Sequence, residues 1–312
     1  MTKNQRTGTR VGLCGLGQMG LPVAARLATA HDVLGYDITA DRRTMAHQIE
    51  RVTTTDRLAD LAGCDTIVLS LPNPAISRTV LADLAPQLNT GTLVVETSTV
   101  LPSDVREWAQ LLAPTGARVI DAAILSGVAQ MSGGTATLLV GGDRADIEAA
   151  GPVLDALGGA GWSRFGDLGA GMAAKVVNNG VAHAVMVVLT EAFAMSRAEG
   201  LDLADIAAML ERPDGGLIRP LTHRVMERMA AADYDGGMPL EAARKDSTLA
   251  LAMAQRSGTP LFAMQAAQSV YDLAMAAGFG RDDYAAVARL WEDWGGASLG
   301  FRPQTADDGA DS

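Results

Sequence analysis

The 312-residue sequence has few cysteines, no excess of positive charge and no long uninterrupted apolar run. Lysine and arginine total 25 against 36 acidic residues, so the net charge of −11 argues against nucleic acid and anionic membranes as partners. The longest apolar stretch, Val181 to Leu189, is broken by His183 and falls short of the roughly 20 residues that a membrane span requires. We therefore expect no nucleic-acid partner and no membrane span.

Cysteine and histidine offer little chemistry. Cys14 and Cys64 have neither metal-ligand spacing nor a secretory context, so we expect free thiols in a reducing, cytoplasmic compartment. The chain start has no apolar run typical of a signal peptide, which favours the same location. No histidine has a partner at metal or triad spacing, and no metal site is predicted.

Short apolar runs that alternate with helical segments recur through the first half of the chain. This alternation predicts an α/β domain with a Rossmann-type, doubly wound parallel sheet over residues 1–167. The predicted strands are Val11 to Leu13, Val33 to Tyr36, Thr66 to Leu71, Leu93 to Glu96, Val119 to Ala122 and Leu138 to Val140.

The second half has a different pattern, in which Ala, Met, Leu and Val recur at helical spacing. We expect an all-α domain over residues 168–302 and a flexible acidic tail over residues 303–312. Ala170 to Glu199 contains no proline, so one long interdomain helix is predicted there. The apolar surface of these helices, especially Leu249 to Met275, favours a homodimer or homotetramer.

A glycine motif follows the first predicted strand and precedes a helical pattern. Gly15, Gly17 and Gly20 form G-x-G-x-x-G, in which the first glycine permits a tight turn, the second a close approach to a pyrophosphate, and the third helix packing. The helix start adds partial positive charge for the phosphates. We predict a dinucleotide-binding loop, whose residues are Gly15, Leu16, Gly17, Gln18, Met19 and Gly20.

An acidic residue, Asp37, ends the second predicted strand, where the ribose hydroxyls of a dinucleotide would be bound. Because a carboxylate would repel a 2′-phosphate, NAD is favoured over NADP. Arg42 and Arg43 lie a few residues further on and could turn toward such a phosphate, so NADP stays open as the less favoured cofactor. Leu71 and Pro72 follow another strand and are expected to pass over the cofactor.

The predicted long helix carries Lys175, Asn178 and Asn179 among apolar neighbours. Lys175 and Asn179 lie roughly 40° apart around the helix axis, so both can face one cleft, whereas Asn178 is turned somewhat away. A lysine whose pKa is lowered by burial can take the proton of a substrate alcohol as hydride leaves, and return it in the reverse direction. We predict Lys175 as the catalytic acid and base, with Asn179 beside it.

Four segments in this order resemble the β-hydroxyacid dehydrogenase family, which includes 3-hydroxyisobutyrate dehydrogenase and relatives of 6-phosphogluconate dehydrogenase. They are Gly12 to Gly20, Asp121 to Gly134, Gly169 to Asn179, and Lys245-Asp246. The resemblance covers nearly the whole chain. It implies hydride transfer between NAD and a small carboxylate substrate, a β-hydroxy acid or its semialdehyde.

The resemblance also implies roles for individual residues. Ser98 or Thr99 would lie near the nicotinamide ribose, Lys245 would reach the cofactor or substrate, and the loop with Ser126 and Gly127 would bind substrate together with Asn178. Leu125 stands where the family has a serine. Either Ser126 supplies the hydroxyl, or the pocket is more apolar and binds the acid group through Gly127 and backbone amides.

Two other functions stay open. The altered loop at Leu125 favours a related NAD(P)H-dependent reductase of a bulkier aldehyde or an imine, although relatives of that kind usually lack the lysine. A non-catalytic nucleotide-binding protein would need the glycine loop but neither Lys175 nor Asn179.

Overall fold

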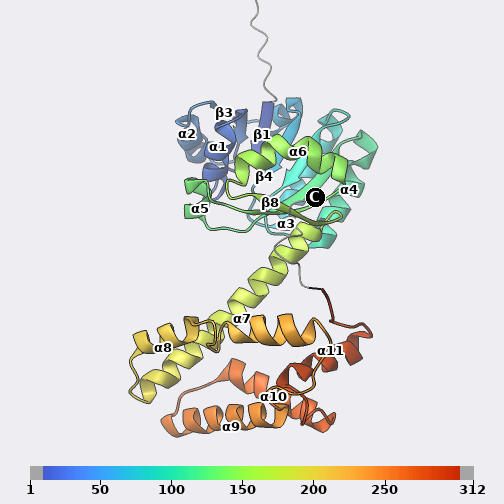
Figure 1. The fold of residues 1–312 in the computed structure, drawn as a ribbon. Helices are drawn as coiled ribbons and strands as arrows, with labels where there is room; N and C mark the ends of the chain where they lie inside the picture. Colours follow the sequence, from blue (N-terminus) through green and yellow to red (C-terminus); the bar gives the residue numbers. More distant parts are fainter. Residues whose placement is uncertain (1–9, 303–312) are drawn as a thin grey trace, which may run out of the picture. The chain divides into compact units, whose positions relative to one another are not determined.

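The computed structural model describes residues 10–302. The chain divides into two compact units, the first ending at Gly180 and the second beginning at Val181 (Figure 1). This division falls inside the long helix α7 (Ala170–Ala198), whereas the sequence predicted a domain boundary just before that helix. The predicted tail, residues 303–312, lies outside the described residues.

The first unit is built on one eight-stranded sheet in the order β3-β2-β1-β4-β5-β6-β7-β8. All neighbouring strands are parallel except β6 and β7, which are antiparallel. The reversal around β1, with β2 on one side and β4 on the other, is the arrangement that binds dinucleotides in doubly wound sheets. The strands are β1 (Arg10–Cys14), β2 (Asp32–Tyr36), β3 (Val52–Thr55), β4 (Thr66–Leu69), β5 (Leu93–Glu96), β6 (Arg118–Ile124), β7 (Leu138–Gly141) and β8 (Trp162–Gly166).

The six strands predicted from apolar runs are confirmed, but two further strands, β3 and β8, escaped the sequence analysis. They are the two edges of the sheet, each paired on one side only. An edge strand needs no continuous apolar run, and the β8 sequence WSRFG contains no buried residue. The expectation of a wholly parallel sheet was wrong at β7, because apolar runs do not encode strand direction.

Helices cover both faces of this sheet and create two buried apolar clusters. One cluster lies under α1, α2, α5 and α6, and the other under η1, α3, α4 and the first turn of α7. The bounds are α1 (Gly20–Ala28), α2 (Ala40–His47), η1 (Leu58–Gly63), α3 (Pro74–Leu84), η2 (Ala85–Gln87), α4 (Pro102–Leu112), η3 (Ala113–Thr115), α5 (Val128–Gly133) and α6 (Arg144–Leu157).

The second unit is helical throughout its described part, as predicted, apart from an isolated bridge between Pro239 and Asp283. Its buried apolar clusters are small: one consists of Tyr234, Ala285, Ala286 and Ala288, and the other of Leu240, Ala274 and Leu290. Its elements after α7 are α8 (Leu203–Glu211), the π-helix η4 (Pro220–Met229), α9 (Leu240–Ser257), α10 (Phe262–Ala276), η5 (Tyr284–Val287) and α11 (Ala288–Gly295).

Helix α7 is longer than the apolar run recognised in the sequence. By length and composition alone it meets the requirement for a membrane span, with mean hydropathy 1.4 over 18 residues, of which 6% are buried. A single helix of this kind is weak evidence for a membrane, because a core or interface helix passes the same test. What it does establish is a largely uncovered apolar helix surface.

Candidate functional site

The glycine loop joins β1 to α1 with little space for side chains at two of its three glycines. Gly15 has a φ of +99°, and a Cβ there would overlap the Ser70 carbonyl oxygen, while a Cβ at Gly20 would overlap the Gly15 carbonyl oxygen. At Gly17 a Cβ would meet no atom within 4 Å. The first and third glycines are therefore required by the fold, and the second lies where a ligand can approach the backbone.

Asp37 follows β2 and connects the glycine loop to the chain that enters α2. Its Oδ2 accepts a hydrogen bond from Leu16 N at 2.8 Å, and its Oδ1 accepts one from Thr39 N at 2.8 Å. Arg43 donates to the Asp37 carbonyl oxygen at 2.7 Å, so its guanidinium is held against the backbone. The hydrogen bonds from Leu16 N and Thr39 N hold the Asp37 carboxylate at the end of β2, where ribose hydroxyls bind in this type of sheet.

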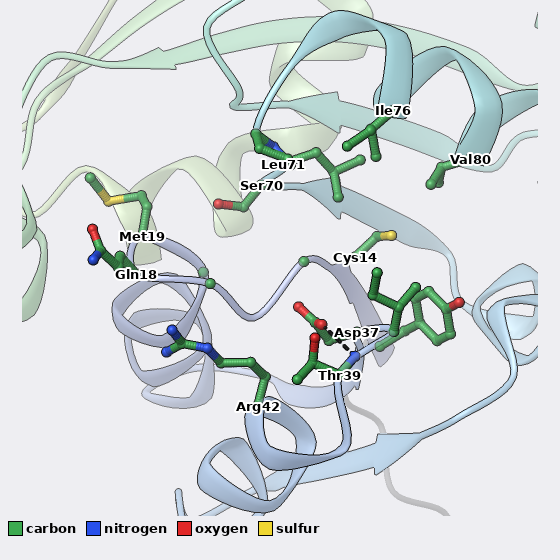
Figure 2. A pocket seen from close by; sticks show the side chains of 16 residues that line it. Cys14, Gln18, Met19, Asp37, Thr39, Arg42, Ser70, Leu71, Ile76 and Val80 are labelled. Atoms are coloured by element: carbon green, nitrogen blue, oxygen red, sulfur yellow. Dashed lines mark hydrogen bonds between the residues drawn. The ribbon is translucent and has the colours of Figure 1, made fainter.

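A cavity of about 550 Å³ opens beside this loop. Figure 2 shows Asp37, Thr39 and Arg42 on one side of it, and Ser70, Leu71, Ile76 and Val80 on the other. The cavity thus combines an apolar wall with a carboxylate and a guanidinium, which suits the adenosine part of a dinucleotide. The residues that were predicted to bind the cofactor and that line this cavity are Gly15, Gly17, Gln18, Met19, Gly20, Asp37, Leu71 and Pro72.

A second cavity, of about 290 Å³, shares Met19, Ser70, Leu71 and Pro72 with the first. Lys175 and Asn179 line it together, as their helical spacing indicates. The predicted residues Ser98, Thr99 and Ser126 also line it. The two cavities therefore adjoin one another within the first unit.

Lys175 is the only ionisable side chain among the described residues that line the second cavity. It is partly buried, and this burial lowers the pKa of its amine below the ordinary value of 10.5. A lowered pKa increases the neutral fraction of the amine near neutral pH. The site thus contains one group that is able to exchange a proton with a bound substrate.

The cysteine closest to the site is not a second reactive group. Cys14 lines the first cavity, but burial, together with the charges of Asp37 and Glu96, raises the pKa of its thiol to about 12. Both cysteines are buried and free, as expected. A thiol with so high a pKa is a poor nucleophile.

Four predicted site residues of the first unit line neither cavity. Leu16 is fully buried, and its N–H donates a hydrogen bond to the Asp37 carboxylate. Gly127 directly precedes α5, and its N–H donates to Gln130 Oε1 at 3.2 Å. Asn178 is exposed, and its amide lies 3.4 Å from Asn179 Oδ1. Lys245 belongs to the second unit, where it is exposed and forms an ion pair with Asp246 at 3.2 Å.

The fourth residue, Leu125, does not line the second cavity, whereas its neighbour Ser126 does. Leu125 packs against the buried apolar cluster under α3 and α4, whereas Ser126 lines the second cavity. Ser126 Oγ also accepts a hydrogen bond from Thr137 N at 3.3 Å, which orients it. The hydroxyl has therefore shifted by one position relative to the family pattern, and the leucine does not make the pocket more apolar.

Several residues of the site were missed in the sequence. Ser70, Thr97 and Ile124 line the second cavity, and each lies at or directly after the carboxyl end of a strand. Ligands bind at that edge of a doubly wound sheet, so strand ends were a usable signal. The first cavity also includes Cys14, Tyr36, Ile38, Thr39, Ile76 and Val80, which had not been predicted to bind the cofactor. It includes Arg42 as well, which the sequence offered only as a contact for the phosphate of NADP.

The sheet order, the glycine loop and a lysine at the adjoining cavity define a nicotinamide-dependent dehydrogenase. Two family models match the chain, and both agree with that class. Residues 10–163 match the NAD-binding domain of 6-phosphogluconate dehydrogenase, and residues 169–291 match a domain described as NAD-binding of NADP-dependent 3-hydroxyisobutyrate dehydrogenase. The chain belongs to the β-hydroxyacid dehydrogenase family.

Similar proteins span the whole architecture. NAD-dependent L-serine dehydrogenase of Pseudomonas aeruginosa is 30% identical over 297 residues, which cover 91% of this chain and 98% of that protein. 2-(Hydroxymethyl)glutarate dehydrogenase of Eubacterium barkeri is 29% identical, covering 93% and 97%. The solved 3-hydroxyisobutyrate dehydrogenase of Mycobacterium tuberculosis with L-serine is 27% identical, with a TM-score of 0.62 and coverage of 91% and 99%.

An imine reductase from Pseudomonas sp. has a similar fold, with a TM-score of 0.81 over 91% of this chain and 99% of that one. At 22% identity this similarity concerns the fold alone. The chain is thus an NAD(P)-dependent oxidoreductase acting on hydroxyl groups, and its own residues fit NAD. The open space at Gly17 suits the pyrophosphate, and Asp37 lies at the end of β2 for the ribose.

Proposed function

We propose that the enzyme interconverts a small β-hydroxy acid and its semialdehyde, with Lys175 as the general acid and base. The observation that carries this proposal is the second cavity, where Lys175 and Asn179 lie with Ser98, Thr99 and Ser126 at the end of the glycine-loop cavity. Three relatives are named for 3-hydroxyisobutyrate, L-serine and 2-(hydroxymethyl)glutarate. In each of these acids the hydroxyl is on the carbon β to a carboxylate.

Each residue has a defined task in this reaction. The residues of the glycine-loop cavity would hold NAD, which would supply the hydride acceptor for the substrate carbon. The neutral Lys175 amine takes the hydroxyl proton during oxidation, and the charged amine returns a proton to the carbonyl oxygen during reduction. Asn179 lies one helical turn from Lys175 and donates a hydrogen bond to the substrate oxygen. The hydroxyls of Ser98, Thr99 and Ser126 bind the carboxylate and the nicotinamide ribose.

The substrate loop no longer favours an imine or a bulkier aldehyde. That alternative depended on Leu125 making the pocket apolar, but this half-buried side chain packs against the core and Ser126 lines the cavity. Hydroxyls and an amide suit a carboxylate better than an apolar imine. A binding protein without catalysis would have no use for a half-buried lysine whose pKa is lowered.

NAD is the preferred cofactor in this proposal. Asp37 is held by two backbone N–H groups at the end of β2, so its negative charge would meet a 2′-phosphate. Arg43, one of the two arginines that could favour NADP, is bound to the Asp37 and Ile38 carbonyl oxygens. Arg42 alone lines the cavity and accounts for any residual use of NADP.

The direct test is turnover of 3-hydroxyisobutyrate, L-serine and 2-(hydroxymethyl)glutarate with NAD and with NADP, followed by absorbance of the reduced nicotinamide. Lys175→Ala should reduce kcat on the best substrate by on the order of 10²- to 10⁴-fold, with the Kd for NAD little changed. Oxidation by the unmodified enzyme should rise with pH as the Lys175 amine loses its proton. Reduction should fall over the same range.

Arg197→Ala is the matched control, since this exposed cation lies at the other end of α7. Its kcat should equal that of the unmodified enzyme. Near-normal turnover by Lys175→Ala would remove the proton-transfer role. No turnover of any of the three acids by the unmodified enzyme would remove the substrate class.

We also propose a homodimer or homotetramer located in the cytoplasm. Apolar side chains of the second unit, among them Met186, Leu249, Phe262 and Trp294, are between 57% and 78% exposed, which a partner copy would cover. The two buried free thiols support a reducing compartment. Sedimentation velocity tests the assembly, and fractionation of the source cells tests the location.

A further inference from the structure

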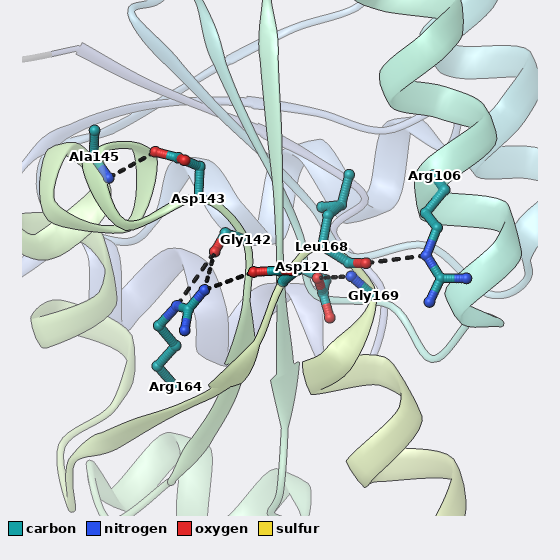
Figure 3. A network of polar contacts seen from close by, with 9 residues as sticks. Arg106, Asp121, Gly142, Asp143, Ala145, Arg164, Leu168 and Gly169 are labelled. Carbon is teal, nitrogen blue, oxygen red and sulfur yellow. Dashed lines mark hydrogen bonds and ion pairs between the residues drawn. The ribbon is translucent and has the colours of Figure 1, made fainter.

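The first turn of α7 is attached to the sheet by one buried carboxylate, that of Asp121 on β6. Asp121 Oδ1 accepts a hydrogen bond from Gly169 N at 2.6 Å, and Oδ2 accepts one from Met172 N at 2.7 Å. Figure 3 shows Asp121 facing Gly169, with Arg106 of α4 donating to the Leu168 carbonyl oxygen at 3.2 Å. The Asp121 carboxylate thus accepts hydrogen bonds from two backbone N–H groups at the start of α7, where N–H groups have no carbonyl partner within the helix.

Two glycines make this contact possible. A Cβ at Gly141 of β7 would lie 2.6 Å from Asp121 Oδ1, and a Cβ at Gly171 of α7 would lie 2.9 Å from Asp121 Oδ2. The backbone of α7 therefore approaches the carboxylate closely and has little room to move. Lys175 follows Met172 by three residues, about one helical turn, so the position of Asp121 determines the position of Lys175.

A second buried carboxylate, Glu96, holds the opposite wall of the same cavity. Glu96 Oε1 accepts from Ser98 N at 2.7 Å, and Ser98 Oγ accepts from Leu71 N at 2.8 Å. Ser98 and Leu71 both line the cavity that contains Lys175. One carboxylate therefore fixes two loops that follow neighbouring strands, β4 and β5.

Glu96 and Asp121 are register partners on the adjacent strands β5 and β6, and neither is accessible to solvent. The pKa of Glu96 is raised to about 7, chiefly by burial and to a smaller extent by the negative charge of Asp121, while hydrogen bonds from Ser98 oppose the rise. Asp121 has N–H donors on both oxygens, whereas Glu96 Oε2 and the Ser77 hydroxyl have no hydrogen-bond partner within residues 10–302. A proton on Glu96 would relieve its repulsion with Asp121.

We propose that Glu96 and Asp121 are a pair of positioning residues that set the distance between Ser98 and Lys175 across the cavity. The pair acts through hydrogen bonds to the two walls and does not touch substrate. This inference rests on the proposed role of Lys175. In addition, two buried carboxylates that do not line the cavity determine where the side chains that line it are placed.

The first test replaces Asp121 by asparagine, which can accept from only one of the two N–H groups. Asp121→Asn should reduce kcat on the order of 10- to 100-fold, because a small displacement of a catalytic group has an effect of that size. The KM for substrate and the Kd for NAD should change less than kcat. Asp146→Asn is the control, since Asp146 of α6 pairs with Arg118 at the start of β6, outside the two cavities, and should leave kcat unchanged.

The second test compares two replacements of Glu96. Glu96→Gln keeps an acceptor for Ser98 N and should retain kcat within about threefold, whereas Glu96→Leu removes the acceptor and should lose as much kcat as Asp121→Asn. If Glu96→Gln retains kcat while Glu96→Leu loses it, the site needs the hydrogen-bond acceptor at this position and not its negative charge. Equal loss in both variants, or no loss in either, would overturn the role of Glu96.

The third readout needs no substrate. The chain contains three lysines, so acetylation of Lys175 can be followed against pH by mass spectrometry, with the exposed Lys245 as internal reference. Asp121→Asn should move the labelling midpoint of Lys175 upward, because a loosened helix start exposes the amine to water. An unchanged midpoint and unchanged kcat, with only a lower Tm, would overturn the inference. If the unmodified enzyme turns over none of the acids, the proposed function fails while this labelling still tests the pair.

Discussion

The two units of the chain bury apolar side chains to very different degrees. In the first unit, helices on both faces of the sheet enclose two large clusters, and residues such as Leu13 and Trp108 are at most 1% exposed. In the second unit the clusters contain three or four fully buried residues each, many of them alanine. The first unit thus has a complete core of its own, whereas the second leaves much of its apolar surface exposed.

The difference follows from the kinds of elements in each unit. A sheet buried on both faces has near-continuous apolar strands, and each face is closed by helices of the same unit. Helices with alanine and methionine distributed around them bury only part of their surface against one another. The unit that contains the predicted chemistry is therefore the self-sufficient one.

The largest expected effect is on the core of the first unit. Leu13→Ala on β1 should reduce the free energy of unfolding by about 3–5 kcal/mol, because it leaves a cavity in a fully buried cluster. Urea unfolding at several protein concentrations checks this, and the loss should be independent of concentration.

Leu249→Ala is the corresponding change in the second unit, at a residue that is 57% exposed in the single chain. It should weaken self-association, seen as a lower average mass by sedimentation velocity. If Leu249→Ala left the mass unchanged and the unfolding of the second unit did not depend on concentration, the contrast between the units would be lost.

The next effect is a pH dependence of stability in the first unit. The pKa of Glu96 is raised from 4.5 to about 7 in the folded chain, so the folded state binds more protons between these values. The stability contributed by the neutral acid is complete below pH 4.5 and is lost as pH rises through 7, a change of about 3 kcal/mol.

Glu96→Gln should remove this part of the pH dependence, as measured by urea unfolding of the two proteins between pH 4.5 and 8. Hydrogen exchange of the strands assigns the change to the first unit. The same slope in both proteins would show that Glu96 is already ionised throughout that range.

The smallest effect concerns a helix start in the second unit. Glu191 of α7 is buried and accepts from Ala263 N at 2.7 Å and Met264 N at 3.0 Å, and also from Phe262 N. Glu191→Ala should reduce stability by about 1–2 kcal/mol through loss of this cap of α10, with faster hydrogen exchange there. The exposed Glu199→Gln provides the control and should change neither quantity.

Local patterns predicted much of the fold and part of the site. The central strands, the glycine loop and α7 have strong periodicity or special backbone requirements, and all were found from the sequence. The edge strands β3 and β8 and the antiparallel β7 were missed, because edge residues need not be apolar and direction depends on packing. Asn178 was assigned by resemblance, yet it does not line either cavity. The role of Lys245, which belongs to the second unit, stays a prediction.

The sequence by itself determined the cofactor loop and the pairing of Lys175 with Asn179. Gly15 and Gly20 tolerate no side chain, and helical spacing places residues four apart on one face. Only the tertiary structure decided that Ser126 lines the cavity while Leu125 packs against the core, and that Glu96 and Asp121 are neighbours on adjacent strands. Such contacts join residues far apart in the chain, so they depend on strand register and helix packing, which no local pattern contains.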